Sequence, residues 1–403
     1  MELAQAFENI SSGEVIKCID MHTTGEPTRI IYSGFPPLTG TLLDKRDQAK
    51  SQYDTIRKRL MLEPRGHDGM YGAIVIPETE LVHSDEAHIG VLFIHNGGFS
   101  TMCGHATIAL GRFLVDTHDL SVFPKRKDLV FDPISKKVAV NIHAPCGLVR
   151  VSVPTTDDGQ KSDPFRSVSF LSTPAYAAGI DLNIKIPAEI RWPELGDKAS
   201  INLDIAYGGA FYALVDVSEL GFKKGLGSVD LISVAHAVGK LKPYLSNHPA
   251  VVDALRIVED KRLSFLYSVM VVDGAGGSRP SNVNGAETGL CFFADSQVDR
   301  SPTGSCVTAR MALAHAKGIR PLAQRWAYNS IVSNYFNEGA FVATIVDQNV
   351  VVHTYDGSVQ PAVVVCVEGV AYYTGSSSFI AEKSDVIGDA GFSMKNAALG
   401  NSV

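Results

Sequence analysis

Two similar segments that lie 200 residues apart carry the side chains of this chain that are best suited to acid–base chemistry. The first contains Cys103, Gly104 and His105, and the second contains Thr303 and Gly304. Each segment follows a polar or glycine-containing loop and opens an apolar stretch with helical spacing, so we expect each to form a helix N-terminus. A thiol at one site and a hydroxyl at the other indicate a reaction that needs only one strong base.

Removal of a proton from a carbon next to a carboxylate would suit such a pair of segments. Backbone N–H groups at a helix N-terminus attract the carboxylate, which gains negative charge as the proton leaves. Gly104 and Gly304 would let the backbone approach this ligand closely, and the same field would stabilise a Cys103 thiolate. The sequence shows no pyridoxal lysine motif, metal-ligand motif or nucleotide-binding loop, so we expect chemistry without a cofactor or a metal.

Length and composition predict a globular protein with a small-molecule substrate. The chain has 403 residues, more than one typical domain, and is 45% hydrophobic and 20% charged. The net charge of −7 disfavours a nucleic-acid partner, and we read the basic run 124–127 as a solvated loop. We see neither a signal peptide nor an apolar run long enough to span a membrane, so we expect a cytoplasmic protein without a membrane partner.

The spacing of apolar residues favours an α+β fold over a Rossmann alternation. Short strand-like runs dominate the chain, and helical periodicity is rarer. We expect two pseudo-symmetric domains, each with strands wrapped around a central helix, and an active site in the interdomain cleft. The clearest strand-like runs are 91–94, 148–153, 341–346, 350–352 and 362–365, and the clearest helical segments are about 43–62, 103–115, 228–241 and 303–317.

Domain boundaries are predicted from the positions of the two motifs. We expect an N-terminal domain over residues 1–178 that carries the Cys103 motif and is completed by 371–403. We expect a second domain over residues 179–370 that carries the Thr303 motif.

Five blocks in this order resemble the signature segments of the proline racemase family, over about residues 14 to 393. The resemblance implies the fold of proline racemase and diaminopimelate epimerase, with the two motifs in one active site. The blocks are residues 19–29, 63–72, 96–110, 204–211 and 299–305.

The two active-site motifs differ from those of the racemases in this family. Racemases and hydroxyproline 2-epimerases carry a cysteine in both motifs, one for each face of the substrate's α-carbon. Here the pair is Cys103 and Thr303, which resembles the family's dehydratases of trans-3-hydroxy-L-proline. The resemblance implies that the substrate carboxylate meets backbone N–H groups, and that a carboxylate, with a histidine as a second candidate, meets the ring nitrogen. The residues so implied are Gly104, His105, Gly304 and Ser305 for the carboxylate, and Asp299 and His105 for the nitrogen.

Acid–base strength agrees with this assignment. A threonine hydroxyl is too weak an acid and base to exchange a proton with an enolate at neutral pH, so racemisation should fail. Dehydration needs only one α-proton removal, by Cys103, with loss of the hydroxyl from the next carbon. In trans-3-hydroxy-L-proline the α-hydrogen and the hydroxyl share a ring face, so a syn elimination is expected. The enamine product would isomerise to Δ1-pyrroline-2-carboxylate, and either Cys103 or another acid would protonate the leaving oxygen.

Two other functions stay open at this point. Cys306 stands where the family usually has glycine, and it could serve as a second acid/base in a proline racemase or hydroxyproline 2-epimerase. Its place almost one helical turn beyond Thr303 favours a packing role. The third function is non-catalytic binding of a small imino acid. A homodimer is compatible with the sequence, which does not determine the oligomeric state.

Overall fold

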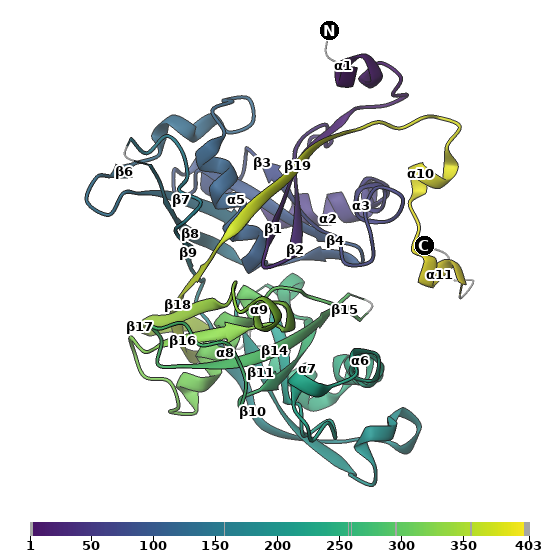
Figure 1. Cartoon of the computed structure of the whole chain (residues 1–403), viewed down its shortest axis with the longest axis vertical. Coiled ribbons are helices and arrows are strands. Elements are labelled where there is room, and N and C mark those ends of the chain that lie inside the picture. Colours follow the sequence, from purple (N-terminus) through teal and green to yellow (C-terminus); the bar gives the residue numbers. More distant parts are fainter. Residues whose placement is uncertain are drawn as a thin grey trace. The chain divides into compact units, whose positions relative to one another are not determined.

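The computed structural model describes residues 3–156, 158–256, 258, 260–294, 296–354 and 357–398. Contacts between residues divide the chain into two compact units (Figure 1). The first unit comprises Met1–Thr101, His105–Val168 and Val370–Val403, and the second comprises Met102–Gly104 and Ser169–Gly369.

The first unit combines paired strands with one long buried helix. Its strands are β1 (Ile16–Thr23), β2 (Glu26–Ser33), β3 (Tyr71–Ile76), β4 (Ile89–His95), β5 (Gly98–Ser100), β6 (Phe131–Asp132), β7 (Lys137–Ala144), β8 (Gly147–Pro154) and β19 (Ala371–Phe379). Its helices are α1 (Leu3–Glu8), α2 (Leu42–Gln52), α3 (Asp54–Met61), α4 (Glu80–His83), α5 (Gly104–Asp116), the 3-10 helix η1 (Pro124–Asp128), α10 (Val386–Ala390) and α11 (Met394–Ala398). Strand β9 (Val168–Leu171) crosses into the second unit.

The second unit has the same kinds of element. Its strands are β10 (Tyr176–Lys185), β11 (Ser200–Tyr207), β12 (Phe211–Asp216), β13 (Leu266–Asp273), β14 (Gly285–Phe293), β15 (Gln297–Val298), β16 (Arg325–Asn329), β17 (Phe341–His353) and β18 (Val359–Gly369). Its α-helices are α6 (Leu231–Asn247), α7 (Pro249–Leu255), α8 (Gly304–Ala316) and α9 (Ile331–Phe336). Its 3-10 helices are η2 (Ala188–Ile190), η3 (Pro193–Leu195), η4 (Leu226–Ser228) and η5 (Lys261–Leu263).

The two units repeat one order of strand pairings. In the first, β19–β1 and β1–β2 are antiparallel, β2–β3 is parallel, β3–β4 and β4–β5 are antiparallel, β4–β7 is parallel and β7–β8 is antiparallel. In the second, the same directions recur in β10–β11, β11–β12, β12–β13, β13–β14, β14–β15, β14–β16 and β16–β17. Helix α5 follows β5 and precedes β7 in the chain, just as α8 follows β15 and precedes β16. Each of the two helices has 13 residues. The predicted internal relationship between the two motif segments therefore extends to whole strand arrangements.

Helix α8 is the buried helix of the second unit. Its residues from Gly304 to Leu313 are buried, and it packs against β10, β11, β17 and β18 (Figure 1). Pro302 and the left-handed backbone of Thr303 prevent the helix from extending upstream. The apolar core of this unit contains Tyr207, Phe211 and Phe292 from the surrounding strands. Helix α5 is equally enclosed in its own unit, since residues 104–115 are buried.

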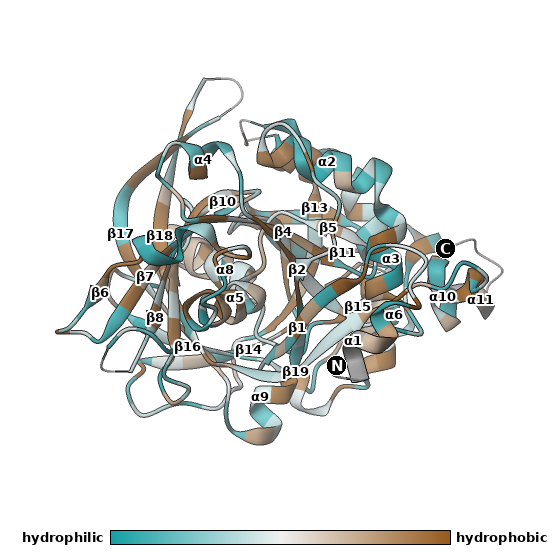
Figure 2. Ribbon diagram, turned by 90° about the horizontal axis from the view of Figure 1, so that it is seen from above, coloured by the Kyte–Doolittle hydropathy of each residue, from teal (hydrophilic) through white to brown (hydrophobic). Residues whose placement is uncertain are grey.

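Three details differ from the sequence-based expectations. The segment predicted as one helix over 43–62 is two helices, because the backbone of Tyr53 leaves the helical region at φ −126° and ψ 18°. The Tyr53 ring packs edge-on against Phe35, a contact that local periodicity does not reveal. Helix α2 itself begins with a capping box between Thr41 and Asp44, and Figure 2 shows it largely in teal, as expected for a hydrophilic helix.

The basic run 124–127 is a 3-10 helix and not a solvated loop. The side chain of Arg126 is buried, and its Nε donates to the carbonyl oxygen of Val115 at 3.1 Å. Lys125 donates to the carbonyl oxygen of Val82 at 2.6 Å. The strand-like runs 341–346 and 350–352 belong to one strand, β17, which has irregular pairing on either side of Asp347.

Within the part of the chain that the structure describes, no helix is both long enough and apolar enough to cross a membrane.

Candidate active site

The loop before α8 is held by hydrogen bonds among its own polar side chains. Asp299 Oδ1 accepts from the backbone N–H of Ser301 at 2.7 Å, and Asp299 Oδ2 accepts from Thr303 Oγ1 at 2.6 Å. Ser301 Oγ accepts from the N–H of Thr303 at 3.1 Å. Asp299 is 5% exposed and Thr303 is 6% exposed. Asp299 therefore orders the loop from inside.

The backbone of Thr303 is strained. Its φ of 63° and ψ of 80° place it in the left-handed region, which a β-branched side chain rarely adopts. Such a conformation costs about 1–3 kcal/mol and persists only where its surroundings impose it. Here Asp299 and Ser301 impose it, and strained residues of this kind cluster at functional sites.

The first turn of α8 can bind an anion. An N-terminal residue such as Thr303 commonly caps its helix by accepting from a first-turn N–H group, yet the Thr303 side chain makes no such bond. The N–H groups of Gly304 and Ser305 therefore receive no cap from it, and the helix dipole adds positive potential at this end. The Ser305 hydroxyl pairs with the buried hydroxyl of Tyr212 at 2.6 Å.

Gly208 lets the turn between β11 and β12 lie against this helix start. A Cβ placed on Gly208 would lie 2.2 Å from the carbonyl oxygen of Ser305 and 2.6 Å from the nitrogen of Ala309. Glycine is therefore required here by close packing. This contact gives a physical reason for Gly208 in the block 204–211.

Two thiols lie behind the same loop. Cys306 is fully buried, and burial raises its pKa well above that of an ordinary thiol. Burial also raises the pKa of Cys291 to about 12. Cys291 Sγ lies 3.0 Å from Ser268 Oγ. Neither thiol is suited to acid–base work at neutral pH.

The start of α5 is anchored by β1 and β3 of the first unit. Thr23 Oγ1 donates to the carbonyl oxygen of His105 at 3.0 Å, and the His105 ring packs edge-on against Tyr71 at 4.7 Å between ring centroids. Cys103 precedes the helix, is 4% exposed and forms no disulfide. Gly111 allows close packing on β8, because a Cβ there would lie 2.7 Å from Cγ1 of Val151.

Gly104 and Gly304 approach each other within the second unit, to which residues 102–104 are assigned. A Cβ on Gly104 would lie 2.5 Å from the Cα of Gly304, and a Cβ on Gly304 would lie 2.9 Å from the Cα of Gly104. Neither position can carry a side chain without displacing the other backbone. The residues that follow Cys103 and Thr303 are thus in direct contact.

Sequence reasoning did not identify Tyr212, Cys291 or Ser268 as neighbours of the second motif. Tyr212 lies 93 residues before Ser305 in the chain, and nothing in its local sequence marks it. Cys291 is one of six cysteines with irregular spacing, and nothing in its local sequence marks it. The turn glycines of the block 204–211 were the one available signal for this part of the site.

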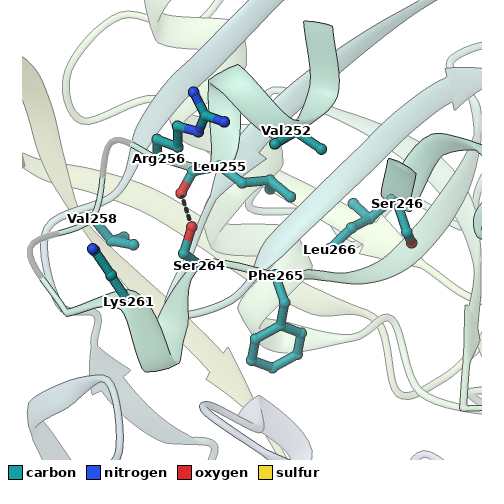
Figure 3. A pocket seen from close by; sticks show the side chains of 9 residues that line it. All are labelled: Ser246, Val252, Leu255, Arg256, Val258, Lys261, Ser264, Phe265 and Leu266. Atoms are coloured by element: carbon teal, nitrogen blue, oxygen red, sulfur yellow. Dashed lines mark hydrogen bonds between the residues drawn. The ribbon is translucent and has the colours of Figure 1, made fainter. Parts of the chain in front are cut away.

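A separate pocket of about 620 Å³ lies between α6, α7, η5 and β13 (Figure 3). Arg256 and Lys261 stand on its wall, and Ser264 Oγ donates to the carbonyl oxygen of Leu255 at 2.7 Å. None of the predicted site residues lines this pocket. Among the described residues, no group of three or more His, Cys, Asp or Glu side chains could hold a metal ion.

Comparisons with known proteins agree with the fold and with the family resemblance. The family described as Proline racemase matches residues 18–393. The human trans-3-hydroxy-L-proline dehydratase is 40% identical over 385 residues, covering 94% of this chain and 95% of the human protein. The trans-L-3-hydroxyproline dehydratase of Xenopus tropicalis is 41% identical over 387 residues, covering 95% and 96%.

A solved structure of a probable proline racemase from Agrobacterium radiobacter has the same fold. Its TM-score is 0.73 at 21% identity, with 94% of this chain and 97% of that chain covered. This likeness concerns the fold alone, whereas the family match and the two relatives extend over nearly the whole sequence. The chain belongs to the proline racemase family.

Proposed function

We propose that this chain is a hydro-lyase that removes water from trans-3-hydroxy-L-proline. The relatives at 40% and 41% identity are dehydratases of this substrate. One observation carries the proposal beyond family membership: the second motif holds a hydroxyl that donates to a buried carboxylate. The described surroundings of that motif offer no exposed thiol, because Cys291 and Cys306 are buried.

The proposed reaction uses one strong base. The Cys103 thiolate takes the α-hydrogen, and the developing negative charge spreads into the substrate carboxylate. The hydroxyl leaves from the adjacent carbon on the same ring face. The hydrogen taken by sulfur then joins the leaving oxygen, so that one water is released and the thiolate is restored. The remaining enamine isomerises to Δ1-pyrroline-2-carboxylate.

The carboxylate is proposed to bind between the two helix starts. N–H groups near Gly104, His105, Gly304 and Ser305 would donate to its oxygens, since uncapped helix N-termini favour anions. Asp299 would neutralise the ring ammonium. The contact between Gly104 and Gly304 supports one shared site for both motifs.

The domain boundaries, the position of the substrate, the oligomeric state and the cellular location are proposals as well. We propose domains of 1–178 with 371–403 and of 179–370, with the substrate in the cleft between them. A homodimer and a cytoplasmic location are retained as predictions from the sequence.

Racemisation through Cys306 receives less support. A second acid/base must reach the α-carbon and must ionise near neutral pH. Cys306 is buried within α8, and burial raises the pKa of its thiol. Non-catalytic binding would not require the strained Thr303 or a thiol at the start of a helix.

A substrate panel tests these functions together. The protein is incubated with trans-3-hydroxy-L-proline, cis-3-hydroxy-L-proline and L-proline. A dehydratase with one base converts the trans isomer to a product lighter by one water, detected by mass spectrometry, and leaves the cis isomer unchanged. A racemase would produce D-proline on a chiral column. An imino-acid binding protein would bind a ligand in calorimetry and convert none, which would refute the proposal.

A further inference from the structure

The hydroxyl groups of Tyr212 and Ser305 form a buried pair at the start of α8. Their oxygen atoms lie 2.6 Å apart. Tyr212, on β12, is fully buried, and Ser305 is 2% exposed. Burial holds the pKa of Tyr212 well above that of an ordinary phenol, so its hydroxyl keeps its hydrogen at neutral pH.

The direction of this hydrogen bond follows from its surroundings. Within the part of the chain that the structure describes, Ser305 Oγ is the one hydrogen-bond partner of the Tyr212 hydroxyl. A phenol has a single hydrogen to donate. Leaving that hydrogen buried without an acceptor is costly, and buried hydroxyl groups rarely do so. Tyr212 therefore donates, and the Ser305 oxygen accepts.

Ser305 is then left with a hydrogen of its own, because a serine hydroxyl can accept and donate at the same time. A hydroxyl in a helix often donates to the carbonyl oxygen four residues earlier, as Thr308 does to Gly304 at 3.1 Å. Ser305 makes no such bond, and among the described residues its side chain bonds only to Tyr212. A buried donor is thus available for a ligand.

This donor lies at the end of α8 that favours an anion. Ser305 is the second residue of the helix, and the Cα–Cβ bonds of a helix tilt toward its N-terminus. The Thr303 side chain does not cap the first-turn N–H groups there, and the helix dipole adds positive potential. A hydroxyl beside these N–H groups can add a charge-assisted hydrogen bond to an anion that they hold.

We propose that Tyr212 positions a side-chain donor for the substrate carboxylate. Tyr212 donates to Ser305, and Ser305 directs its own hydrogen to a carboxylate oxygen at the start of α8. Tyr212 is a positioning residue, because it acts through Ser305 and does not touch the substrate. The proposal rests on the proposed function and specifies how a residue from another strand sets the strength of carboxylate binding.

A pair of ligands provides a readout that a merely structural role would not move. L-proline carries a carboxylate, and L-prolinamide carries a neutral amide in its place. Calorimetry gives the preference for the carboxylate as the ratio of the two Kd values. We expect Ser305→Ala to lower this ratio by about tenfold, as for loss of a hydrogen bond to a charged group. A general loss of structure would weaken both ligands alike.

A double-mutant cycle tests whether Tyr212 acts through Ser305. Tyr212→Phe keeps the buried ring and removes only the hydroxyl, and it should lower the carboxylate preference by roughly three- to tenfold. The variant that carries both changes should fall within about twofold of Ser305→Ala, because the two changes remove one shared interaction. Losses that multiply, or a wild-type preference in Tyr212→Phe, would overturn the role of Tyr212. A wild-type preference in Ser305→Ala would refute the contact with the carboxylate.

Tyr244→Phe is the matched control. The Tyr244 hydroxyl, on α6 of the same unit, donates to the carbonyl oxygen of Lys185 at 3.0 Å. This variant also loses one hydrogen-bonded phenol and should keep the wild-type preference, and circular dichroism checks the fold of every variant. If wild type makes no dehydrated product from trans-3-hydroxy-L-proline, the proposed function fails, whereas the ligand preference still tests the roles of Tyr212 and Ser305.

Discussion

At the scale of single residues, position 303 separates this chain from a two-base enzyme. A thiol there could ionise near neutral pH, whereas the Thr303 hydroxyl cannot, and its hydrogen is directed to Asp299. We therefore propose Cys103 as the one base. The two neighbouring thiols do not change this conclusion, because Cys291 and Cys306 are buried and their pKa values are raised by that burial.

Replacement of the proposed base should remove activity and spare the fold. We expect Cys103→Ser to lower the dehydration rate by at least about a thousandfold, because a serine hydroxyl is a poor base near neutral pH. Product formation is measured by mass spectrometry, with circular dichroism as the check on folding. Cys366→Ser, at a half-buried thiol of β18, should behave as wild type. Near-normal turnover by a folded Cys103→Ser protein would show that another group is the base.

A thiol at position 303 should restore two-sided proton transfer. We expect Thr303→Cys to produce D-proline from L-proline at a slow but measurable rate, whereas wild type should produce none. Chiral chromatography after long incubation is the measurement. Cys306→Ala should leave dehydration largely unchanged. D-proline formed by wild type and lost in Cys306→Ala would instead identify Cys306 as a second acid/base.

Sequence motifs identified candidate residues for this site but not the reasons for their geometry. Cys103, Thr303 and Asp299 stand in short segments that resemble family signatures, so they could be chosen as candidates from local sequence alone. The hydrogen bond from Thr303 to Asp299 could not, because it depends on a left-handed backbone that threonine rarely adopts. Tyr212 and Cys291 reach the site from other strands.

At the scale of elements, the second site depends on how closely α8 is packed. A Cβ on Gly208 would collide with backbone atoms of the first two turns. We therefore expect Gly208→Ala to destabilise the protein by about 1–3 kcal/mol and to lower kcat, because overpacking displaces rigid neighbours. Gly274→Ala is the matched control, since a Cβ there meets nothing within 4 Å. Thermal denaturation and initial rates check both, and equal behaviour of the two variants would contradict the packing argument.

The middle of α8 is linked to the sheet by a carboxylate whose side chain is 15% exposed. Glu287 on β14 lies 2.9 Å from Arg310 of α8 and 3.4 Å from Arg320. Glu287→Gln would leave two largely buried guanidinium groups without their counter-ion, and we expect a loss of about 3–5 kcal/mol in the free energy of unfolding. Urea denaturation measures it.

A surface carboxylate provides the comparison for that ion pair. Glu219 pairs with Lys198 at 2.6 Å, and both side chains are partly exposed. Glu219→Gln should cost less than about 1 kcal/mol. Comparable losses in the two variants would mean that the buried pair contributes no more than an exposed one.

Helix and strand prediction succeeded where periodicity and burial coincide. Helices α5 and α8 appear close to the expected residues, because their apolar positions are buried in the described structure. The segment 43–62 failed as one helix, since a ring contact made by Tyr53 overrides a continuous pattern. The run 124–127 failed as a loop, because Arg126 has a buried backbone partner.

At the scale of the whole molecule, the repeated order of strand pairings gives each unit one buried helix that begins next to a predicted motif. The sequence indicated this repeat only through the two short similar segments that contain Cys103 and Thr303. The full correspondence needed long-range pairings, such as β1 with β19, that no local pattern encodes. The histidines differ between the two units. In the first unit, several histidines accept hydrogen bonds from backbone N–H groups at an unprotonated Nδ1 atom.

These histidines predict that the first unit loses stability on mild acidification. His22 Nδ1 accepts from Gly25 N–H at 3.1 Å, and His88 Nδ1 accepts from Asn141 N–H at 2.8 Å. Burial lowers the pKa of both, and of His143. A folded-state pKa below the unfolded value of about 6.5 means that the unfolded chain binds more protons. The stabilisation is therefore complete above that value and is lost as the pH falls through the folded-state values.

Hydrogen exchange followed by mass spectrometry measures this loss separately in each unit. Between pH 7.5 and pH 6, after correction for the intrinsic exchange rate, peptides from β4 and β7 should lose protection, because opening becomes easier as histidines bind protons. Peptides from α8 and β14 should change less. His88→Asn keeps a side-chain oxygen that can accept from Asn141 N–H and does not titrate in this range, so it should reduce the loss at β7. A pH response at β7 that is identical in wild type and His88→Asn would show that protonation of His88 does not control the stability of this strand.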